Sequence, residues 1–157
     1  MQEKQKKWIL RIALYLIGIM VLALGITLNT KTNLGVSPII SMPYAVAQIF
    51  GYETGTAVFV AYLIFIVLQI VLLKGKFPPF QFLQVAASYL TSAFITIFDR
   101  IIPTPDQMGM RLLVLALAII LTGIGAAVTV DVNIIPNPAD GLARVLGERC
   151  GKNMGFG

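Results

Sequence analysis

Residues 12–28 read IALYLIGIMVLALGITL, and no charged side chain stands between Arg11 and Asn29. A helix needs about 20 apolar residues to cross the roughly 30 Å hydrocarbon core of a membrane. Three further stretches, 57–73, 77–98 and 112–130, also lack charges. We therefore predict an all-α integral membrane protein with four transmembrane helices, because a helix satisfies its backbone hydrogen bonds within one segment of lipid-embedded chain.

The composition agrees with a lipid environment, since 57% of the residues are hydrophobic and only 12% are charged. Soluble domains average about 25% charged residues. The basic residues stand at span ends and do not share one face, so a nucleic-acid partner is not expected. The chain has no histidine and a single cysteine, Cys150. We therefore expect no enzyme, no cofactor and no metal site.

Lysine and arginine near the span ends predict the orientation. Lys4, Lys6, Lys7 and Arg11 precede the first span, and Lys74 and Lys76 join the second to the third. Two spans separate the N-terminus from the connection between the second and third spans, so both basic groups lie on the same side of the membrane. This pattern places the N-terminus in the cytoplasm.

Polar side chains recur along the third span at steps of three or four, so most of them share one helical face. That face is expected to turn toward protein, either to pack against other helices or to line a pathway. Gln69 and Gln84 are expected to hydrogen-bond across the hairpin between spans, and Asp99 and Arg100 to form a pair at the membrane rim. The polar set is Gln81, Gln84, Ser88, Thr91, Ser92 and Thr96.

The chain matches itself without a gap when it is shifted by 100 residues. The identical pairs are Arg11/Arg111, Ile19/Ile119, Gly25/Gly125, Asn33/Asn133, Pro38/Pro138, Gly51/Gly151 and Gly55/Gly155. The matched spans are the first and the fourth, so the second copy crosses the membrane in the opposite sense. We predict an incomplete 3+3 inverted repeat. Residues 1–100 form the first repeat and residues 101–157 begin the second, which is truncated.

Each copy carries a short capped helix after its matched span. Ser37 and Asn137 are typical N-caps, and each is followed by a proline suited to the first helical position. The predicted short helices, 38–50 and 138–150, stop at Gly51 and Gly151, where a left-handed C-terminal cap is expected. Whether these helices re-enter the membrane or lie on its surface is open.

Several of these segments resemble the YczE/YyaS/YitT family of bacterial integral membrane proteins. The resemblance rests on the stretch 32–38 (TNLGVSP), on Asp99 and on the stretch 138–142 (PADGL). Family members usually have an arginine where this chain has Ala139, and often a tryptophan where it has Ile39. The resemblance implies a roughly six-span protein of the bacterial cell (inner) membrane. It implies no reaction, because the family's activity is mostly unassigned.

The two capped turns are the candidate substrate site, since free N–H groups at a helix start attract anions. One wall would be Asn33, Ser37 and Pro38, and the other Asn133, Asn137, Pro138 and Asp140. Plain helix capping is the competing interpretation. Asp140 would bind a cation or proton if it is buried, and would be a favourable N-terminal charge if it lies at the interface.

Two functions fit this pattern. The first is a permease for a small, unidentified solute that binds between the repeat turns. The alternative is a structural or regulatory membrane partner that transports nothing and uses its short helices for docking. A homodimer is compatible with either function.

Overall fold

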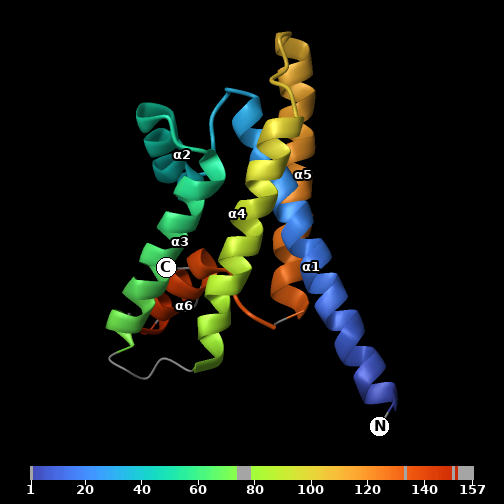
Figure 1. The fold of residues 1–157 in the computed structure, drawn as a ribbon, viewed down its shortest axis with the longest axis vertical. Helices are drawn as coiled ribbons and strands as arrows, with labels where there is room; N and C mark the ends of the chain where they lie inside the picture. Colours follow the sequence, from blue (N-terminus) through green and yellow to red (C-terminus); the bar gives the residue numbers. More distant parts are fainter. Residues whose placement is uncertain (1, 74–78, 133, 150, 152–157) are drawn as a thin grey trace.

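The computed structural model describes residues 2–73, 79–132, 134–149 and 151, which form helices and connecting turns. The long helices are α1 (Gln2–Lys31), α3 (Thr54–Leu72), α4 (Leu83–Ile101) and α5 (Met108–Val132). The short helices are α2 (Pro38–Phe50), α6 (Pro138–Arg149) and the 3₁₀ turn η1 (Pro79–Phe82). The long helices stand side by side, with α2 and α6 toward opposite ends of the bundle (Figure 1).

Within the described residues, three helices are long and apolar enough to cross a membrane: residues Gln5–Lys31 of α1, all of α3 and all of α5. Helix α4 is as long as α3, at 19 residues, but its polar side chains lower its hydropathy. Three of the four predicted spans therefore correspond to helices of this kind, and the predicted count of four is not confirmed. The third span was expected to begin at Phe77, but helix α4 begins at Leu83, directly after η1. Prolines suit the start of a helix better than its interior.

The packing of α1 against α5 depends on two glycines. A Cβ atom added to Gly25 would lie 2.6 Å from the backbone nitrogen of Thr122, and one added to Gly125 would lie 2.5 Å from the backbone nitrogen of Leu22. Both distances are far below an ordinary contact of about 3.5–4.0 Å. The contacts pair higher residue numbers on α1 with lower residue numbers on α5. The two helices are therefore antiparallel, and their backbones touch at these glycines.

The polar face of α4 turns into the protein, as predicted. Gln84, Ser88, Thr91 and Ser92 are all buried. The Ser92 hydroxyl donates a 2.7 Å hydrogen bond to the carbonyl of Gly55 on α3. The expected bond across the hairpin is confirmed, since the side-chain amides of Gln69 and Gln84 donate to each other at 3.3 and 3.4 Å. These side chains bind α4 to α3.

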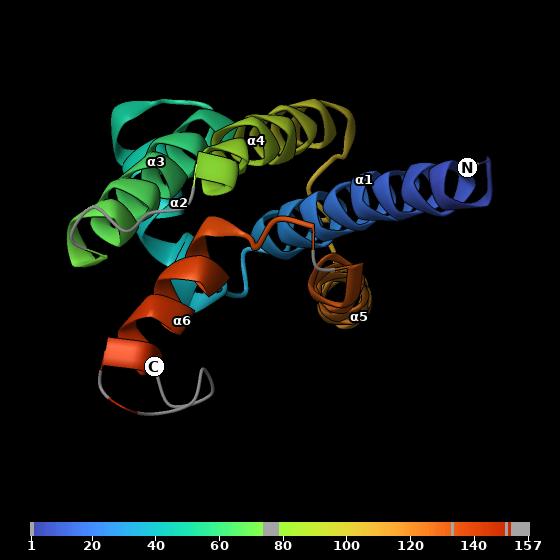
Figure 2. The same cartoon turned by 90° about the horizontal axis from the view of Figure 1, so that it is seen from below.

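The short helices begin at the predicted prolines, Pro38 and Pro138. With 13 and 12 residues, α2 and α6 are too short to cross a membrane. Each is followed by a glycine in the left-handed conformation, Gly51 with φ 71° and Gly151 with φ 65°. Both helices pack on α3, and α6 runs outward from the middle of the bundle (Figure 2). Cys150, the predicted last residue of α6, lies outside the described residues.

Candidate functional site

A polar pocket of about 240 Å³ lies where α1 and α4 end and α3 begins. It is lined by polar side chains from four helices and two loops, and their spread shows that tertiary packing assembles the pocket. The lining residues used below are Lys31, Asn33, Tyr44, Gln48, Thr54 and Asp99. We refer to this cavity as the polar pocket.

An ion pair crosses the polar pocket between α1 and α4. The ammonium nitrogen of Lys31 lies 3.0 Å from Oδ1 of Asp99, and the two side chains are 18% and 34% exposed. Because the pair is partly buried, dissolved salt weakens its attraction less than it would weaken that of a fully exposed pair. The prediction that Asp99 pairs with Arg100 is wrong, because Arg100 pairs with Glu53 on the other side of α4. Consecutive residues of a helix point about 100° apart, so each finds a different neighbour.

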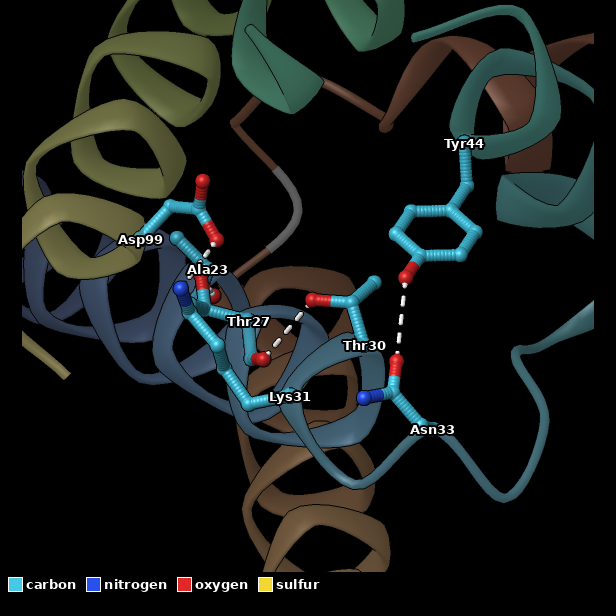
Figure 3. A network of polar contacts seen from close by, with 7 residues as sticks. All are labelled: Ala23, Thr27, Thr30, Lys31, Asn33, Tyr44 and Asp99. Carbon is cyan, nitrogen blue, oxygen red and sulfur yellow. Dashed lines mark hydrogen bonds and ion pairs between the residues drawn. The ribbon is translucent and has the colours of Figure 1, made fainter. Parts of the chain in front are cut away.

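Asn33 reaches the polar pocket through an unusual backbone conformation. Its φ of 54° is left-handed, a region that asparagine tolerates better than most residues. The Tyr44 hydroxyl on α2 donates to its Oδ1 at 3.4 Å (Figure 3). The Asn33 amide therefore joins the end of α1 to α2, within the pocket that also holds the Lys31–Asp99 pair.

Ser37 lies in the same turn but faces a different cavity. Ser37, with Asn29 and Ile40 among others, lines a cavity of about 170 Å³ between α1, α2 and α5. The hydroxyl of Ser37 makes no capping hydrogen bond, contrary to the prediction. The backbone N–H groups of Ile40 and Ser41 already donate to the Ser37 carbonyl. Pro38 is exposed at the start of α2.

The turn before α6 is bonded more tightly. Oδ1 of Asn137 accepts the Ala139 N–H at 3.2 Å, which confirms this N-cap. The amide of Asn137 also faces the hydroxyl of Tyr62, near the middle of α3. The carbonyl of Pro138 accepts a 3.0 Å hydrogen bond from the buried amide of Gln69. This turn is therefore held inside the bundle.

Asp140 lies in the first turn of α6 and is neither fully buried nor exposed. Burial raises the pKa of its carboxyl above the ordinary value of 3.8. Removal from water disfavours a carboxylate, and this is the cause of the shift.

The predicted site residues thus fall into separate places. Asn33 belongs to the polar pocket, Ser37 to the cavity beside α5, and Asn137 and Pro138 to a small space lined also by Tyr15 and Leu22. Asn133 lies outside the described residues. A hydrophobic cluster that includes Leu22, Ile40 and Tyr62 lies between the two turns.

The sequence reasoning missed the two charges of the polar pocket. From the sequence, Lys31 has no predicted role, and Asp99 is expected to pair with Arg100 at the membrane rim. A signal was present, because each is a charge just beyond an apolar span, and the predicted topology puts both on the same side of the membrane.

Comparison with known proteins agrees with the architecture. Residues 9–157 match the Family of unknown function (DUF6198). The chain belongs to this family. It is also 28% identical over 152 residues to a protein described as "Uncharacterized membrane protein YczE" from Bacillus subtilis (strain 168). That alignment covers 96% of the chain and 69% of the relative. The resemblance noted from the sequence is confirmed, and the chain is a membrane protein. No solved structure matches it.

Proposed function

We propose that the protein is a permease for small solutes in the bacterial cell (inner) membrane, with no catalytic activity of its own. In this proposal the N-terminus is cytoplasmic and α4 is a fourth span whose polar face is covered by α1 and α3. The polar pocket then opens on the extracellular side, and α6 lies on the cytoplasmic side. The proposal rests on two features of the packing.

The first feature is the crossing of α1 and α5, which carries the proposal. Gly25 meets Thr122 and Gly125 meets Leu22. Each residue in one contact has its counterpart, 100 positions away, in the other contact. Reciprocal contacts of this kind are what a two-fold axis between matched helices produces. They support an inverted repeat, which is the architecture of many secondary transporters.

The second feature is the depth at which the short helices begin. Ile40, in the first turn of α2, packs into the cluster that contains Tyr62. Asn137, just before α6, faces the same tyrosine. Tyr62 is near the midpoint of α3, so Asn137 lies inside the bundle and the first turn of α2 places one side chain, Ile40, in its core. Non-helical backbone at this depth is tolerated where protein or a water-filled cavity surrounds it.

Cysteine accessibility tests the proposal. In a Cys150→Ser background, Ser37→Cys and Asn137→Cys would each be treated with a membrane-impermeant maleimide, in intact cells and in inside-out vesicles. We expect labelling at position 37 from outside and at position 137 from inside. Ile64→Cys is the control, because Ile64 is an exposed apolar residue of α3 that would face lipid.

A lack of labelling at both positions, with the protein inserted, would remove the water-filled approaches that a permease needs. Labelling of both from the same side would contradict the inverted topology. Either result would leave the family assignment and the membrane helices standing.

A further inference from the structure

The polar pocket contains one positive and one negative side chain among the residues that line it, Lys31 and Asp99. A ligand with a single charge would pair with one of them and leave the other without its partner. Loss of a partner is costly for a charge that is partly removed from water. A ligand with both charges replaces the internal ion pair with two new pairs. The charge balance therefore favours a zwitterion.

The neutral groups of the polar pocket offer further hydrogen bonds. Thr54 lines the pocket and is 5% exposed, so its hydroxyl is available to a ligand in the cavity. The amide of Gln48 also lines the pocket and is not engaged by another described residue. A hydroxyl and an amide at the wall of the cavity can therefore hydrogen-bond a ligand beside the two charges.

The size of the polar pocket limits the ligand. Its volume is about 240 Å³, below the range of about 300–1,000 Å³ for drug-sized ligands. The Lys31 ammonium and the Asp99 carboxylate are 3.0 Å apart, so the two charges of the ligand must also stand close together. An α-amino acid or a betaine has this form.

We propose that the polar pocket binds a small zwitterionic solute of the amino-acid class, with the solute carboxylate on Lys31 and its ammonium on Asp99. Asn33, held by Tyr44, and Thr54 supply hydrogen bonds beside the charges. The inference rests on the proposed permease function only for passage of the solute across the membrane. The headgroup of phosphatidylethanolamine has the same pair of charges, so free solute and lipid are tested separately.

The test is a thermal-shift titration of the detergent-solubilised protein with glycine, L-alanine and glycine betaine. Acetate and methylammonium are the single-charge controls, and a short-chain phosphatidylethanolamine is the lipid arm. We expect a saturable rise in midpoint temperature with at least one zwitterion, and at least tenfold weaker binding of both single-charge compounds. A response to the lipid alone would support the zwitterion site and identify the headgroup as its source.

Two variants test the roles of the charges. Asp99→Asn should lose its preference for glycine over acetate, and Lys31→Gln should lose its preference for glycine over methylammonium. A purely structural ion pair would not change selectivity in these opposite directions. Glu53→Gln is the matched control, because it breaks the more exposed Arg100–Glu53 pair at the same end of the bundle and should leave selectivity unchanged.

If a single variant does not fold, the double variant Lys31→Gln/Asp99→Asn removes both charges without leaving either unpaired, and it should not respond to any zwitterion. The proposal is overturned if no zwitterion or lipid stabilises the wild-type protein, or if the charge variants bind as the wild type does. Binding without uptake of labelled glycine into proteoliposomes would contradict the permease function and leave the pocket assignment intact.

Discussion

The close contact between α1 and α5 predicts that Gly125→Ala destabilises the protein. The new Cβ would lie 2.5 Å from the backbone nitrogen of Leu22 and 2.7 Å from its Cα atom. Carbon–carbon contacts are most favourable at about 3.5–4.0 Å, so the helices would have to separate by roughly 1 Å. The atoms in the way belong to the backbone of a helix, and no side-chain rotation relieves the clash.

The expected cost is the upper part of the range for overpacked cores, about 2–3 kcal/mol. In a chain of this size, each kcal/mol shifts the midpoint of thermal unfolding by roughly 2–4 °C. We therefore expect a fall of roughly 4–12 °C, measured as the temperature at which the detergent-solubilised protein loses its monodisperse size-exclusion peak.

Gly123→Ala is the matched control, because a Cβ at this position meets nothing within 4 Å. It should be neutral, or stabilising by up to about 1 kcal/mol through the higher helix propensity of alanine. If Gly125→Ala and Gly123→Ala have the same midpoint, α1 and α5 are not packed as closely as the structure shows. Gly25→Ala should resemble Gly125→Ala, and the double variant should cost less than the sum, since one separation relieves both clashes.

Other variants also have defined outcomes. Gln69→Leu and Gln84→Leu should each cost about 1–3 kcal/mol by leaving a buried amide unpaired, while the double variant should cost less than the sum in the same heating assay. Tyr15→Phe should cost about 0.5–1.5 kcal/mol by removing the 3.0 Å hydrogen bond to the Ile135 carbonyl. Asp140→Asn should stabilise the protein at pH 7 and lose that advantage below pH 3.8, which pH-dependent melting would show.

The sign for Asp140 follows from its raised pKa. The folded protein holds this proton more tightly than the unfolded chain does, so stability falls as pH rises from 3.8 through the folded-state pKa. Asparagine is never ionised and avoids that loss. A less stable Asp140→Asn variant at neutral pH would contradict this reasoning. It would indicate that the carboxylate has a favourable partner near α6.

Helix α6 is held in place at the Gln69 side chain by a hydrogen bond and by close packing. The Gln69 amide donates to the Pro138 carbonyl, and a Cβ added to Gly141 would meet the Gln69 side chain at 2.7 Å. The same amide is bonded to Gln84, so α3, α4 and α6 share one buried polar junction. In the proposed permease, a change in this junction would move the start of α6 relative to α3 and α4.

The sequence predicted the features that depend on neighbouring residues. Apolar runs between charges gave the long helices, and the polar residues spaced by three and four in α4 gave the buried face. The prolines at 38 and 138 marked helix starts, and Gly51 and Gly151 marked ends with positive φ. Each of these depends on local backbone conformation or on the 3.6-residue period of a helix, which a sequence displays directly.

Other features required the tertiary structure. The Lys31–Asp99 pair and the contact of Gly25 with Thr122 join residues that are far apart in the chain. They depend on how each helix is rotated about its axis and where it crosses its neighbours, quantities set by the packing of the whole bundle. The sequence by itself therefore determined which segments are helical and where the short helices begin. Only the packing decided which charges meet, because the rotation of α4 about its axis sets whether Asp99 or its neighbour Arg100, about 100° away, faces Lys31.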